Sequence, residues 1–113
     1  MNLEEELNML YDSLEKPIKR GIQDLMDELD YRSQWLARSG ELLADAQALL
    51  DRKKGEESEK FIGREESWNI IKNLIESNCA EEKRIYNLAE RVNAILTHQI
   101  DAIRTMISYQ KEE

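Results

Sequence analysis

Apolar side chains recur every three or four residues along two stretches of the chain, residues 3–54 and residues 65–111. This spacing places them on one face of a helix, which has ~3.6 residues per turn. The first repeat contains Leu3, Leu7, Leu10, Leu14, Ile18, Ile22, Leu25 and Leu29. The second contains Ile85, Leu88, Val92, Ile95, Leu96, Ile100, Ile103, Met106 and Ile107. The pattern predicts two long helical arms.

A polar joint, residues 55–64, separates the arms. Arms of similar length on either side of a joint predict an antiparallel helical hairpin in a single all-α domain, residues 1–113. A reversal centred near residues 59–60 would place Ile22 beside Thr97. It would also place residues 78–84, which lack a large aliphatic side chain, opposite residues 36–41. We therefore expect a thin and deformable waist at that level.

Pro17 interrupts the first arm, and proline either kinks a helix or begins a new one because it lacks an amide donor. Asp12 could cap a new helix with Glu15 as its capping-box partner. The apolar stripe continues through the proline in phase, which favours a kink or a short N-terminal helix nearly collinear with the next. The alternative is that residues 3–14 fold back after Pro17 and cover one end of the hairpin.

Each arm carries a second apolar row beside the first, so its apolar face is broader than a two-helix hairpin can bury. Exposed apolar stripes of this extent usually mark an interface. We expect either a homodimer that forms a four-helix bundle or a helical partner protein that completes one. The residues expected at this interface are Trp35, Leu42, Leu49, Leu96, Ile100, Ile103 and Ile107.

The net charge of −8 argues against direct nucleic-acid binding, which requires clustered lysine and arginine side chains. No apolar run exceeds three residues, so we expect no insertion into a membrane. The first residues lack the basic and apolar regions of a secretory signal. We therefore expect a cytoplasmic protein, with export lacking a cleaved signal peptide as the alternative.

The sequence contains no recognisable set of catalytic or ligand-binding residues. The lone histidine, His98, has Ile95 three positions before it, which excludes the paired Glu-x-x-His motifs of di-iron bundles. Cys79 has no disulfide partner, and the glycines are too far apart to form a phosphate-binding loop. We therefore expect no enzyme activity, no cofactor and no metal site.

Two short segments resemble motifs of a known family. Phe61-Ile62-Gly63 stands in the joint where WXG100 (ESAT-6-like) proteins of type VII export systems carry Trp-x-Gly. The last five residues, from Tyr109 to Glu113, fit the Tyr-x-x-x-Asp/Glu pattern near the C-terminus of that family, as does Tyr86 to Glu90. In layout the chain is similar to these helical hairpins. The resemblance implies a helical partner, a four-helix complex and export without a cleaved signal. The chain departs from the family in having Phe61 in place of tryptophan.

Phe61 and Trp68 lie in or beside the joint. They are expected either to cap the end of the bundle by folding onto Leu49 and Leu50 or to form a small docking patch. The sequence as a whole predicts a non-enzymatic helical interaction module: an adaptor, an assembly factor or an inhibitor. Two alternatives stay open, a type VII-like exported hairpin and an acidic inhibitor of a nucleic-acid-binding enzyme.

Overall fold

The computed structural model describes residues 1–112, which form four α-helices and contain no strand. The prediction of an all-α fold is therefore confirmed. The molecule is a rod with principal extents of 70 × 28 × 18 Å. None of the helices in the described part of the chain is long and apolar enough to cross a membrane. The helices are α1 (Leu3–Leu14), α2 (Ile22–Glu59), α3 (Trp68–Asn78) and α4 (Ala80–Glu112).

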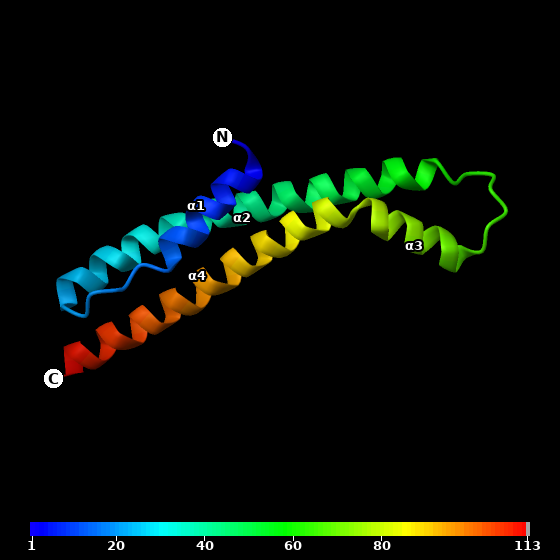
Figure 1. Ribbon diagram of the computed structural model, residues 1–113. Coiled ribbons are helices and arrows are strands. Elements are labelled where there is room, and N and C mark those ends of the chain that lie inside the picture. The colour runs from blue at the N-terminus through cyan, green and yellow to red at the C-terminus, as the bar shows by residue number, and fades with distance from the viewer. Residues whose placement is uncertain (113) are drawn as a thin grey trace.

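The long helices α2 and α4 lie side by side and run in opposite directions along the rod (Figure 1). Hydrogen bonds between them set the register: Asn93 Nδ2 donates to Ser39 Oγ at 3.3 Å, and Arg32 donates to Gln99. The expected pairing of Ile22 with Thr97 is therefore wrong. So is the expected waist, because Ser39 lies opposite Asn93 and not opposite residues 78–84.

The register differs because the chain reverses later than expected. α2 does not stop at Lys54 but continues through Gly55 to Glu59, and α3 begins only at Trp68. A single glycine costs a helix only about 1 kcal/mol relative to alanine, so Gly55 does not end α2. The turn proper contains Gly63, whose φ of 81° lies in the left-handed region that glycine adopts without strain.

The first arm is broken near Pro17, and α1 folds back onto the rod (Figure 1). The nearly collinear arrangement that the stripe favoured is wrong, and the fold-back alternative is observed. Asp12 is not the cap of a new helix. Asp12 lies inside α1. The N-cap of α1 is Asn2, whose Oδ1 accepts a hydrogen bond from the amide of Glu5 at 2.8 Å. Pro17 and Gly21 lie in the linker, residues 15–21, that leads to α2.

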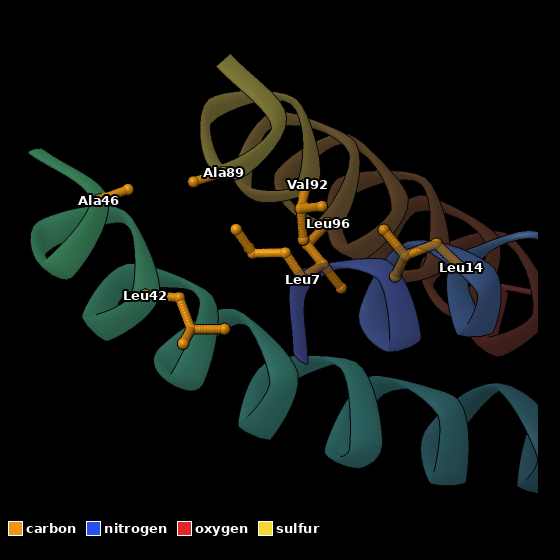
Figure 2. Close-up of a cluster of buried hydrophobic side chains, with 7 residues drawn as sticks. All are labelled: Leu7, Leu14, Leu42, Ala46, Ala89, Val92 and Leu96. Atoms are coloured by element: carbon orange, nitrogen blue, oxygen red, sulfur yellow. The ribbon is translucent and has the colours of Figure 1, made fainter. Parts of the chain in front are cut away.

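The fold-back packs one face of α1 into a three-helix core. Leu7 and Leu14 of α1 meet side chains from both long helices, and Figure 2 shows them converging between the ribbons. Two positions of this core, one on α2 and one on α4, hold alanine. The buried residues of this cluster are Leu7, Leu14, Leu42, Ala46, Ala89, Val92 and Leu96.

Two smaller apolar clusters stabilise the ends of the rod. Leu25, Ile103 and Ile107 form one at the hinge end, where α2 begins and α4 ends. At the loop end, where the chain reverses between α2 and α3, the cluster consists of Leu50, Ile75 and Cys79. The apolar core is thus divided into three parts along the rod.

The second arm is two helices and not one. At Cys79 the backbone leaves the helical region, with φ −102° and ψ 11°, and Figure 1 shows α3 and α4 meeting there at an angle. The amide of Cys79 still donates to the carbonyl oxygen of Ile75 at 3.0 Å. The break is therefore a kink that tilts α3 relative to the rod.

Candidate interaction surface

Most residues expected at a partner interface lie inside the chain. α1 covers part of that face, and the observed register pairs α2 with α4 over the rest. The expectation that these side chains stay exposed is therefore wrong. Trp35 and Leu49 are half-buried. The fully buried ones are Leu42, Leu96, Ile100, Ile103 and Ile107.

A different apolar surface is exposed at the loop end. Trp68 is 69% exposed, Ile70 is 53% exposed and Leu74 is 40% exposed, all on α3. Ile62 in the preceding turn is also exposed. We call Ile62, Trp68, Ile70 and Leu74 the α3 surface. Large apolar side chains gathered on one short helix are more informative than the same number scattered singly.

This surface arises because the apolar arc of α3 is wider than its contact with α2. Ile71 and Ile75 lie on the inner side, and Ile75 is buried against Leu50. Ile70 and Leu74 each precede an inner residue by one position, which turns them by ~100° around the helix and out of the contact. The kink at Cys79 ends α3 before it can follow α2 for a longer distance.

The α3 surface is nearly neutral in an otherwise acidic protein. Within α3 the charged residues are Lys72 and Glu76, and their charges are opposite. Both line a shallow cavity of about 240 Å³ between α2 and α3, together with Trp68. Asn73 and Ser77 occupy other exposed positions of the helix. A partner of this surface would therefore gain most from apolar contact and little from charge.

The two aromatic residues of the joint have different environments. Phe61 is half-buried and packs against the Leu50 cluster, and the guanidinium of Arg64 lies 4.9 Å from the centre of its ring. Trp68 does not cap the bundle end and stays in solvent. Gly63 has open space around the position of a Cβ, so its positive φ is what requires glycine there.

The exposed residues Ile62, Ile70 and Leu74 were not among the predicted site residues. The sequence does carry a signal for them, because apolar residues occupy nearly half of α3 and extend around most of one side. The residues of the C-terminal pattern remain apart from this surface. Tyr109 is exposed on the last turns of α4. Glu113 lies outside the described residues.

Glu57 ties the two helices of the loop end together. Its carboxylate is buried in the last turn of α2, where the helix dipole disfavours a negative charge. It accepts hydrogen bonds from Lys60 Nζ at 2.8 Å and from Asn78 Nδ2 at 3.0 Å, and Lys53 Nζ lies 3.3 Å away. The bond from Asn78 connects the end of α2 to the residue next to the kink. These bonds, led by the one from Lys60, lower the pKa of Glu57 to about 2.

The stability of the protein should therefore fall in acid. The Glu57 carboxyl has an ordinary pKa of 4.5, so its stabilising effect is complete above that pH and is lost as the pH falls towards 2. We expect Glu57→Gln to unfold at lower urea concentration than the wild type at pH 7. The difference should shrink below pH 4.5 and vanish near pH 2. Glu56→Gln, at an exposed neighbouring position, should match the wild type at every pH. A constant difference for Glu57→Gln would contradict this assignment.

Cys79 is buried beside the kink and lines a cavity of about 370 Å³ with Leu50, Lys54, Glu76 and Lys83. Burial raises the pKa of its thiol, and the nearby carboxylates of Glu82 and Glu57 raise it further. The thiol is therefore protonated at neutral pH and is a poor nucleophile. Cys79 contributes to packing at the kink.

The described residues offer few groups for chemistry. Within residues 1–112, no group of three or more His, Cys, Asp and Glu side chains is placed to hold a metal ion. His98 is exposed on α4. The Oδ1 atom of Asp101, three residues further along α4, lies 3.9 Å from Nη1 of Arg104. No protein-family model, curated protein or solved structure matches this chain.

Proposed function

We propose that the protein is a non-enzymatic helical interaction module that binds an apolar, helical surface of another protein through the α3 surface. The observation that supports this most strongly is the exposure of Trp68, Ile70 and Leu74 together on a short helix. Tryptophan is among the residues that contribute most to protein–protein binding energy. An exposed tryptophan flanked by an i, i+4 aliphatic pair is a suitable anchor for a partner.

The arrangement of helices supports a helical partner. Around α1 the rod has three helices in cross-section, but the loop end has only α2 and α3. Two helices from a partner would complete a four-helix bundle at this end and cover the outer side of α3. The partner site predicted from the sequence thus moves from the α2–α4 face to α3.

We expect the double substitution Ile70→Asp and Leu74→Asp to weaken partner binding at least tenfold, because it places charge in an apolar contact. A photo-crosslinking amino acid at Asn69, an exposed position beside Trp68, should capture a partner in native cell extract, and this partner should be lost in the double variant. Asn73→Asp, on the same helix, should retain it. Both side chains are largely exposed, so the double variant should stay folded and lose no more than about 2 kcal/mol of unfolding free energy, mainly through the lower helix propensity of aspartate. Equal capture by all variants would overturn the proposal.

Salt dependence separates this proposal from an acidic inhibitor that acts through its carboxylates. Apolar binding through the neutral α3 surface should change little between low and high salt. Binding through the net charge of −8 should weaken steeply as salt rises. Measuring the dissociation constant of the captured partner over a salt series distinguishes the two. A steep loss of affinity with salt would favour the inhibitor.

A further inference from the structure

We propose that α1 is an exchangeable segment, so that two copies of this chain pair by docking α1 of each into the groove between α2 and α4 of the other. The groove, the linker and the hinge end of the rod support this pairing independently. The proposal does not depend on the α3 surface.

The groove is shaped for an amphipathic helix of the α1 type. Leu7 is completely buried and Leu14 nearly so, and they are one heptad apart on the same face of α1. Ala46 and Ala89 line the groove with short side chains, which leaves room for the leucines between the long helices. The contacts are formed by side chains of separate helices, so α1 of another copy can make every one of them.

Charges beside the groove fix the direction of α1. Glu6 Oε1 accepts a hydrogen bond from Arg38 Nη2 of α2 at 2.9 Å. On the other side, Glu4 Oε1 accepts one from Arg84 Nη2 of α4 at 2.6 Å. Exposed ion pairs of this kind add little stability, about 0–1 kcal/mol each, but they distinguish one orientation from its reverse. The groove therefore selects an apolar helix with acidic residues in its first turns.

The linker has the features of a hinge. Residues 15–21 contain exposed Pro17 and end at Gly21, which caps α2 without a side-chain hydrogen bond. The apolar repeat nevertheless stays in phase from Leu14 through Ile18 to Ile22. The sequence is thus compatible with a straighter connection, which would carry α1 away from its own groove. Exchange of a segment across such a hinge is a low-cost route to a dimer because the docked contacts are retained.

The hinge end offers surface that an exchanged pair would cover. If α1 continues in the direction of α2 and enters the groove of a second copy, the two rods meet at their hinge ends around a two-fold axis. Ile22 and Met26 of α2 are exposed at this end, and so is Tyr109 of α4. Gln110 donates to the carbonyl oxygen of Arg20, which places the end of α4 beside the linker. These apolar side chains would be shielded from water in the pair.

Cross-linking between different variants tests the exchange directly. In a Cys79→Ala background, chains carrying Glu6→Cys are mixed with chains carrying Arg38→Cys, unfolded together, refolded and treated with a short bis-maleimide. We expect a covalent pair containing one chain of each kind, increasing with protein concentration. Mixing Glu6→Cys with Asn69→Cys, at the loop end, should give none. Absence of the Glu6–Arg38 pair at all concentrations would overturn the proposal.

Removing the proline from the linker provides a second test, read from the association constant measured by sedimentation at several concentrations. Pro17→Ala should raise the association constant about tenfold, because it permits a straighter linker.

The outcomes distinguish exchange from association through α3. The Glu6→Cys and Arg38→Cys chains should cross-link equally well with and without the added substitutions Ile70→Asp and Leu74→Asp. A dimer that lacks this cross-link and dissociates in the α3 variant would overturn exchange. An association constant for Pro17→Ala equal to that of the wild type would overturn it too.

Discussion

Replacing Leu96 with alanine is expected to lower the free energy of unfolding by about 3 kcal/mol, the usual cost of removing a fully buried leucine side chain. Leu96 has no exposed surface and lies where α1, α2 and α4 meet. Its loss would leave a cavity lined by leucines from α1 and α2, which cannot close without moving a helix. A loss of this size is a large part of the total stability of a small domain, ~5–15 kcal/mol. Urea unfolding followed by circular dichroism measures it.

The matched control is Leu74→Ala, the same chemical change on the α3 surface. Leu74 is 40% exposed, so we expect it to change the free energy of unfolding by less than about 1 kcal/mol. If both substitutions cost the same, the described packing of the three-helix core would be wrong. A small effect of Leu96→Ala together with loss of helix content from α1 would indicate that α1 leaves the groove readily.

Replacing Arg32 with alanine is expected to destabilise the protein by about 2–3 kcal/mol, because it removes a buried side chain that donates hydrogen bonds to charged and polar partners on two helices. Arg32 is only 1% exposed, and its Nε donates to Glu28 Oε2 at 2.9 Å. It also donates to Gln99, whose Nε2 in turn donates to the carbonyl oxygen of Leu14 at 3.1 Å. One side chain therefore links α2, α4 and the end of α1. Its guanidinium also lies 5.4 Å from the ring centre of Trp35.

Arg32→Met separates the charge from the packing. Methionine retains most of the apolar stem, so this variant should be more stable than Arg32→Ala. Arg91→Ala, at an exposed position of α4, should change the free energy of unfolding by no more than about 0.5 kcal/mol. Urea unfolding of the three variants measures these differences in the free energy of unfolding. Equal stability of Arg32→Ala and the wild type would show that the polar link does not hold the helices in register.

The helical class was predictable because helical periodicity is a local property of the sequence. Apolar residues from Leu3 to Leu29 repeat at heptad-like steps, and the helices observed there follow that repeat. The position of the reversal was not predictable in the same way. Gly55 marked a joint in composition, but the helix continues through it, and the resulting shift changes every cross-helix pair. Local propensity predicts helices, whereas register depends on contacts between distant residues.

The candidate site was predictable only in part. Trp68 was identified from its place beside the joint and is exposed, as a docking residue must be. Leu42 and Leu96 were assigned to an interface because the fold-back of α1 could not be chosen over a collinear helix from the sequence. Ile70 and Leu74 were missed because their exposure depends on how α3 tilts at Cys79. Their orientation is a tertiary property.

The division of the core into three clusters makes the loop end of the rod easier to open than its centre. Only Leu50, Ile75 and Cys79 are buried in the cluster that fastens α3, whereas the central cluster draws on three helices. Regions with few buried apolar contacts open at lower free energy than the rest of a protein. The loop end, which carries Trp68, can therefore change its conformation to fit a binding partner while the central helices keep their packing.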